Sequence, residues 1–331
     1  MWTEVAWRQL LRGIEATFTA GWSVGEVAYA MRHPKRLRED PFRKAVLEDI
    51  DQHGLYKRFA CEAQVLVPDR RGWMSMSNPY VRVGGGETDK VVAQLRRVKR
   101  PRRRHVVVVC HCYGLPLPAL MEQLFGLHLI DEVDVVYNIM NHHYLGSFRF
   151  WPGFGLFSPQ MSRVVENVRS SVTGLRALLR SLVHTFGYEE VTLVGYSIGG
   201  HLSLHVANHH PIDRLVAYCP VTSLEQTATE LGLMPWMSSG VARTLERMQG
   251  EFDFGDLDVL NPLNQDIGLS IEDLLLILQT HDAMVPTRQS MPILERYPSV
   301  RCLEYPGTHA FPVERRAMQR AVREFVLSGK G

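Results

Sequence analysis

The chain has 331 residues, of which 45% are hydrophobic and 22% charged, and this composition excludes general disorder. Its net charge of +2 indicates no general affinity for nucleic acid, and its longest apolar runs, 106–110 and 274–278, fall far short of the roughly 20 residues of a membrane-spanning helix. The chain has five cysteines, and charged residues are scattered through its N-terminal segment, which lacks the apolar region of a secretory signal. Both features favour a cytoplasmic chain with free thiols over a secreted, disulfide-bonded one.

The first 57 residues are expected to form a helical extension. Asp40 can cap an amphipathic helix, Pro41 fits its first turn, and Gly54 stands just past its end. Residues 58–83 alternate between polar and apolar and predict two or three antiparallel strands. The glycines at 84–86 are then expected to open a helical stretch that ends near residue 98.

Residues 96–105 contain seven lysines or arginines. Such a run can form a patch for an anionic surface or a nucleic acid, or it can be a solvated connector between two elements. The connector is favoured, because no aromatic residues interleave the basic ones to stack on bases.

After residue 101, short apolar runs alternate with long amphipathic segments, which predicts a mainly parallel sheet covered by helices on both faces. The runs are 106–110, 133–139, 191–194, 215–219, 274–278 and 300–305. An insertion at 221–269 interrupts the alternation and is expected to form a lid over the substrate. The core would then comprise residues 58–220 and 270–331.

The sharpest motif is Gly-Tyr-Ser-Ile-Gly at 195–199, which follows the apolar run 191–194 and precedes a helical stretch. This strand, turn and helix are the context of a nucleophile elbow, in which a tight turn exposes Ser197 and requires glycine on both sides. An incidental serine in a glycine-rich turn would match the motif equally well. Partner residues must therefore decide between the two.

A serine nucleophile needs a histidine base and an orienting carboxylate. Asp282 and His309 each follow a predicted strand, as Ser197 does, and the carboxyl ends of parallel strands share one crevice. Three other histidines are weaker candidates for the base. His281 adjoins Asp282, whereas His201 and His205 lie on the helix after the elbow.

A second group of residues, Cys-His-Cys-Tyr at 110–113, ends the first core strand. The loop after this strand should supply one oxyanion-binding N–H, from Cys112 or preferably Tyr113, and Ile198 should supply the other. Successive strand residues point to opposite faces, so Cys110, His111 and Cys112 cannot all bind one metal ion. We expect no metal site.

These motifs resemble those of the α/β-hydrolase superfamily. The resemblance covers residues 101–331 and implies an α/β-hydrolase fold, with a mostly parallel eight-stranded sheet, a serine nucleophile, a histidine base and an acid. It departs from the family at Cys112, where the family loop usually has glycine after histidine. The N-terminal extension, including residues 18–22, also resembles the branch called α/β-hydrolase domain-containing protein 18.

Two apolar segments can line the pocket, or the first can pack against the N-terminal helices and the second can form a fixed helical cap. Their members are Tyr144, Phe148 and Trp151 after a core strand, and Met234 and Trp236 in the insertion. The sequence therefore predicts a serine hydrolase that cleaves an ester or thioester of an apolar or aromatic small molecule through an acyl-enzyme, without a cofactor. Two alternatives stay open: an acyltransferase or cyclase using the same three residues, and a catalytically silent binding protein. A homodimer also stays open.

Overall fold

Eight strands form a single sheet in the computed structural model, which describes residues 40–56, 64–83, 85, 89–98, 104–113, 118–141, 143, 156, 161–209, 211–227 and 254–328. Their order across the sheet is β1-β2-β4-β3-β5-β6-β7-β8, and only the pairs made by β2 are antiparallel. The mostly parallel eight-stranded sheet is as predicted. The strands are β1 Trp73–Ser77, β2 Lys90–Arg96, β3 His105–Cys110, β4 Asp134–Ile139, β5 Glu190–Tyr196, β6 Arg214–Tyr218, β7 Leu274–Gln279 and β8 Arg301–Tyr305.

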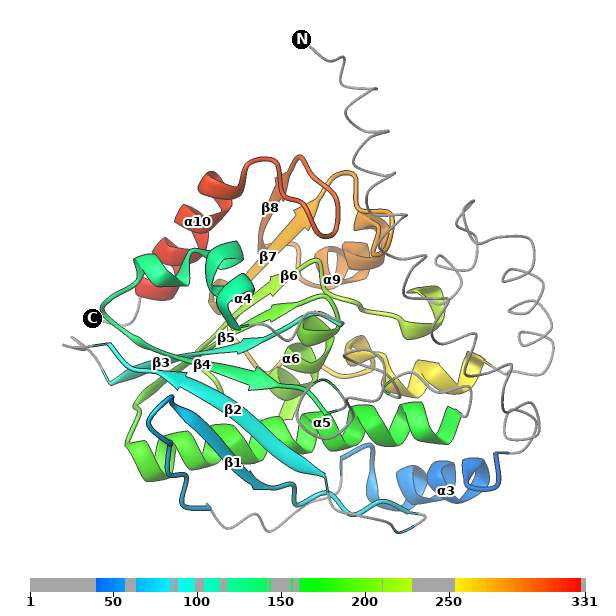
Figure 1. The fold of residues 1–331 in the computed structure, drawn as a ribbon. Coiled ribbons are helices and arrows are strands. Elements are labelled where there is room, and N and C mark those ends of the chain that lie inside the picture. The colour runs from blue at the N-terminus through cyan, green and yellow to red at the C-terminus, as the bar shows by residue number, and fades with distance from the viewer. Residues whose placement is uncertain are drawn as a thin grey trace, which may run out of the picture.

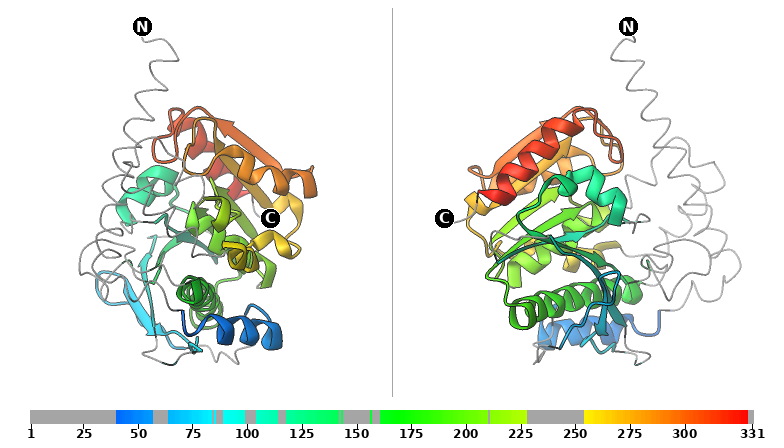
Figure 2. Two further views of the ribbon diagram at one scale, coloured as in Figure 1. Left: turned by 90° about the vertical axis from the view of Figure 1, so that its right-hand side faces the viewer. Right: turned by 60° about the vertical axis from the view of Figure 1, so that its left-hand side comes forward.

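Helices cover both faces of the sheet (Figures 1 and 2). One face packs against α3, α5, α6 and α9, and the other against α4 and α10. In β3, Val106 and Val108 join the first hydrophobic cluster while Val107 and Val109 join the second, so the strand is buried throughout. The helices are α3 Arg43–His53, α4 Pro118–Phe125, α5 Met161–Ser181, α6 Ile198–His209, α9 Met291–Arg296 and α10 Arg315–Leu327.

Short helical turns link several of these elements. Leu182–Phe186 forms a π-helical turn that ends α5 at Gly187, which adopts φ 71°. In the part of the chain that the structure describes, the turns of 3-10 type are Leu127–Leu129, Phe254–Leu260, Pro262–Asn264, Ile271–Asp273 and Thr287–Ser290. The described part of the insertion therefore rejoins the core through 3-10 turns rather than long helices.

The helix expected between residues 84 and 98 is wrong, because Lys90–Arg96 forms β2. Val91, Ala93 and Leu95 alternate with more exposed residues, so one side of the segment is buried. The segment pairs with β1 on one side and β4 on the other, and these ladders outweigh the helical preference of its Ala, Gln and Leu residues.

Asp40 does not cap the helix that follows it, contrary to the sequence expectation. α3 begins at Arg43 without a side-chain cap, and the Asp40 carboxylate instead accepts hydrogen bonds from the N–H and hydroxyl of Ser162. Ser162 lies in the first turn of α5, whose unpaired N–H groups need acceptors. Asp40 thus stabilises the start of α5, and Gly54 ends α3 with φ 76° as predicted.

Among the described residues, no helix has both the length and the apolar character that crossing a membrane requires.

Candidate active site

Ser197 is the single residue between the end of β5 and the start of α6, and it adopts φ 58°. This conformation is unfavourable for any residue with a Cβ. The neighbouring glycines are required by space. A Cβ on Gly195 would lie 2.6 Å from the Gly199 carbonyl oxygen, and a Cβ on Gly199 would lie 2.2 Å from that of Cys110. The turn therefore has the sharp geometry that the motif predicts.

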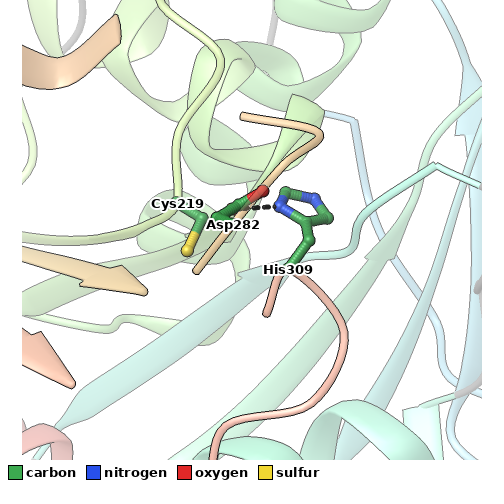
Figure 3. A group of neighbouring side chains, drawn as sticks. All are labelled: Cys219, Asp282 and His309. Carbon is green, nitrogen blue, oxygen red and sulfur yellow. Dashed lines mark hydrogen bonds and ion pairs between the residues drawn. The ribbon is translucent and has the colours of Figure 1, made fainter. Parts of the chain in front are cut away.

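The side chains of Ser197, His309 and Asp282 form a continuous hydrogen-bonded chain. The Ser197 hydroxyl donates to His309 Nε2 over 2.8 Å, and His309 Nδ1 donates to Asp282 Oδ2 over 2.6 Å. His309 follows β8 and Asp282 follows β7, and Figure 3 shows their two side chains facing each other. All three residues are more than nine-tenths buried. The structure thus brings together the hydroxyl, imidazole and carboxylate that the sequence singled out.

Both oxygens of the Asp282 carboxylate have partners. While Oδ2 faces His309, Oδ1 accepts the backbone N–H groups of Met284 at 2.9 Å and Val285 at 2.7 Å. These bonds fix the plane of the carboxylate. They also fix the imidazole of His309 with its proton on Nδ1, which leaves Nε2 as the acceptor for Ser197.

The start of α6 lies against the residues that follow β3. A Cβ on Gly199 would come within 2.5 Å of the His111 carbonyl oxygen, so the two backbones are in close contact. Ile198 is the first residue of α6, where N–H groups have no intrahelical acceptor. The start of α6, where the Ile198 N–H is free of intrahelical bonding, and the residues after β3 are therefore neighbours in the fold.

His111 orients the peptide group that joins Cys112 to Tyr113. Its Nε2 accepts the N–H of Met140 at 3.1 Å, so the ring proton is on Nδ1, which donates to the Cys112 carbonyl oxygen at 2.6 Å. The peptide is trans, so its N–H, which belongs to Tyr113, points away from that carbonyl.

Cys112 adopts an ordinary negative φ, since the only described non-glycine residues with positive φ are Ser197 and Cys219. The cysteine therefore fits where the family usually has glycine without backbone strain. Burial raises the pKa of the Cys112 thiol to about 12 and that of Cys110 to about 11. Both thiols therefore stay protonated near neutral pH.

Tyr196, to which the sequence analysis assigns no role, contacts His309 directly. Its hydroxyl donates to the backbone carbonyl of His309 over 2.6 Å, and the two ring centroids are 5.1 Å apart. Burial raises the pKa of the Tyr196 phenol well above its ordinary value, so the hydroxyl keeps the proton that it donates. In the sequence, only the position of a tyrosine directly before Ser197 points to this contact with His309.

Two solved structures with the same architecture show which fold the chain has. A serine hydrolase without lid from Xanthomonas campestris superposes with a TM-score of 0.51 at 15% identity, over 80% of this chain and 96% of its own. An esterase from Pyrococcus furiosus superposes with a TM-score of 0.52 at 15% identity, over 82% of this chain and 100% of its own.

The chain has the α/β-hydrolase fold. No protein-family model matches the sequence, and no curated protein matches it either. Within this fold, Ser197, Asp282 and His309 follow β5, β7 and β8 at one edge of the sheet, as the sequence predicts.

Five residues predicted to line the pocket lie outside the described residues: Tyr144, Phe148, Trp151, Met234 and Trp236. Most of the predicted lid and the first 39 residues also lie outside them. The pocket lining, the lid and the division into an extension, a core and an insertion therefore stay predictions.

The competing histidines are bonded elsewhere. His201 donates from Nδ1 to the Val221 carbonyl oxygen at 2.9 Å, and His205 donates from Nε2 to that of Leu260 at 2.7 Å. The backbone N–H of His281 donates to the Gly307 carbonyl oxygen at 2.9 Å, which ties the loop after β7 to the loop after β8. His309 is therefore the histidine that the fold directs at Ser197.

The buried histidines predict a loss of stability in acid. Burial lowers the pKa of both His111 and His201 from 6.5 to about 4. Between these values the unfolded chain binds more protons than the folded one, so the stabilisation present above pH 6.5 disappears as pH falls toward 4. Each histidine contributes roughly 3 kcal/mol to this loss. Urea unfolding at pH 7.5, 6 and 5 measures it.

A matched pair of variants isolates one histidine. In His201→Asn the amide can still donate to the Val221 carbonyl oxygen but does not titrate, so stability should fall less steeply between pH 7.5 and 5. His128→Asn, the same substitution in an exposed turn, is the control for replacing a histidine by asparagine. An identical pH dependence in His201→Asn and the wild type would contradict the assignment.

Proposed function

We propose that the protein is a serine hydrolase that cleaves esters or thioesters of small molecules. The observation that carries this proposal is the hydrogen-bonded chain from Ser197 through His309 to Asp282, presented on a strained turn at the carboxyl edge of the sheet. Strain of this kind persists only where the surrounding structure enforces it, and it clusters at functional sites. A serine with a purely structural role would not require this strained backbone conformation.

The geometry supports a two-step acyl-enzyme reaction. Ser197 Oγ attacks the acyl carbon while His309 Nε2 takes the hydroxyl proton, and the resulting imidazolium is stabilised by Asp282. His309 then returns the proton to the leaving alcohol or thiol. In the second step His309 takes a proton from water, which attacks the acyl carbon, and then gives that proton to Ser197 Oγ as the acid leaves.

Two backbone donors are proposed to bind the tetrahedral oxyanion: the N–H of Ile198 at the start of α6 and the N–H of Tyr113. The helix N-terminus favours negative charge, and the bond from His111 to the Cys112 carbonyl preorients the second donor. Two donors held in this way beside the Ser197–His309 bond would support catalysis rather than the silent binding protein. Acyl transfer or cyclisation would use the same first step with another nucleophile in place of water.

A fluorophosphonate probe tests the activation of the serine. The probe should label the wild-type chain once, and peptide mapping should place the label on Ser197. Hydrolysis of p-nitrophenyl esters of increasing acyl length then measures turnover. A label on any other residue, or no label at all, would overturn the proposal, whereas a labelled serine that hydrolyses no ester offered would favour acyl transfer.

Tyr196→Phe tests whether the hydroxyl of Tyr196 positions the base. The variant keeps the buried ring but loses the bond to the His309 carbonyl, so kcat is expected to fall about tenfold with KM unchanged. Steady-state kinetics on a short ester measures both constants.

The control for this variant is Tyr188→Phe, which removes a buried hydroxyl bonded to Asp134 at the opposite edge of the sheet. It should lower the thermal midpoint without changing kcat. Equal effects of the two variants on kcat would show that the Tyr196 hydroxyl has only a structural role.

A further inference from the structure

A third side chain with metal-binding chemistry lies beside Asp282 and His309. The Cys219 Sγ, a carboxylate oxygen of Asp282 and a ring nitrogen of His309 all lie within 4.8 Å of one another (Figure 3). All three residues are buried, with Cys219 only 1% exposed. We propose that these three side chains bind a zinc ion, and that the ion reversibly inactivates the catalytic site.

The donor set fits zinc better than the common hard cations. Zinc binds thiolate, imidazole and carboxylate together, commonly with three protein ligands and an open fourth position. Zinc bonds of about 2.0–2.3 Å place tetrahedral ligand atoms roughly 3.5 Å apart. Small side-chain movements would bring the present atoms to that spacing. Magnesium and calcium require more oxygen ligands than this cluster offers.

The backbone presents Cys219 in an unusual way. It directly follows β6 and has φ 42°, a conformation that glycine would adopt without strain. Its N–H donates to the Ile277 carbonyl oxygen of β7 at 2.8 Å, which fixes it beside the strand that leads to Asp282. The thiol is therefore held next to the Asp282–His309 pair by the sheet itself, before any ion binds.

Binding requires the exchange of two protons for one ion. His309 Nε2 faces Ser197, so the nitrogen on the Asp282 side is Nδ1, which carries a proton. Zinc would displace this proton and the thiol proton of Cys219 into solvent, with no change of oxidation state. The carboxylate of Asp282 would then bind zinc instead of orienting His309. Loss of activity follows from this step and rests on the proposed function, whereas zinc binding does not.

Zinc binding is tested on the full chain after metal removal, under reducing conditions, by competition with a chromophoric chelator. Wild-type protein and Ser197→Ala should each bind one zinc ion, since Ser197 supplies no ligand. Cys219→Ala should lose this site, while Cys302→Ala, at the half-buried cysteine of β8, should keep it. Substitution with Co²⁺ should give a thiolate-to-cobalt absorption band that is absent from Cys219→Ala.

Activity provides the second measurement. Zinc should inhibit ester hydrolysis by the wild type, and a chelator should restore it. The inhibitory concentration should rise at least tenfold in Cys219→Ala, measured against the activity of the same variant without zinc. Cys219→Ser, which keeps the side-chain volume, gives the same comparison if the alanine variant folds poorly.

Two results would overturn the zinc site: unchanged zinc stoichiometry in both Cys219 variants, or a cobalt complex without the thiolate band. A chain that binds one zinc through Cys219 but hydrolyses nothing would contradict the proposed function and leave the zinc site intact. The two proposals can therefore fail separately.

Discussion

Replacing Ser197 by alanine is expected to lower kcat for ester hydrolysis by about 10⁶ while the fold stays intact. The substitution removes only the hydroxyl oxygen, together with its hydrogen bond to His309 Nε2. Without this oxygen no acyl-enzyme can form, and the remaining groups can only assist direct attack by water. The measurement is kcat on a p-nitrophenyl ester, together with loss of fluorophosphonate labelling.

The matched control is Ser290→Ala, which removes another buried serine hydroxyl, in the 3-10 turn Thr287–Ser290 that follows β7. It should retain wild-type labelling and kcat. Hydrolysis by Ser197→Ala within tenfold of the wild type would rule out Ser197 as the nucleophile. Thermal unfolding of both variants checks that activity, rather than folding, has been compared.

A glycine at position 197 would separate strain from chemistry. Because Ser197 has φ 58°, Ser197→Gly should relieve backbone strain and raise the free energy of unfolding by roughly 1 kcal/mol relative to Ser197→Ala. Both variants should be inactive. Urea unfolding measures the difference, and equal stability of the two would show that the turn stores no strain.

The core strands and the elbow could be predicted from sequence because their patterns have one physical solution. Runs such as 106–110 are short, apolar at every position and rich in valine, which favours a strand buried on both faces. Glycine is required at 195 because a Cβ there would clash with the Gly199 carbonyl oxygen, and at 199 because a Cβ there would clash with that of Cys110 on the neighbouring strand. The apolar runs repeat along the chain and the two glycines flank one serine, so both patterns can be recognised in a single sequence.

Other features depend on partners that are far away in sequence. The residues of β2 suit either a helix or a strand, and the sequence analysis predicts a helix. Only pairing with β1 and β4 makes the segment a strand. Asp40 lies 122 residues from Ser162, and no spacing rule links them. The bond from Tyr196 to His309 and the position of Cys219 depend likewise on how the loops after β6, β7 and β8 meet.

Replacing Asp282 by asparagine is expected to lower kcat by about 10⁴ with little change in KM, because it selects the wrong tautomer of His309. The N–H groups of Met284 and Val285 require an acceptor at the position of Oδ1. The asparagine oxygen must therefore occupy that position, and its NH₂ group must face His309. An NH₂ donor requires Nδ1 as acceptor, which moves the ring proton to Nε2, where it blocks acceptance of the Ser197 proton.

Asp134→Asn is the control for this prediction. Asp134 is also buried at the start of β4, where its carboxylate accepts hydrogen bonds from the Tyr188 hydroxyl and the Val98 N–H. That end of the strand lies at the opposite edge of the sheet, so the variant should lose stability and keep its kcat. If Asp282→Asn instead kept full kcat, His309 would not need a carboxylate to set its tautomer. The two N–H groups that fix Asp282 would then serve only the turn before α9, and the acid of the catalytic chain would have to be sought elsewhere.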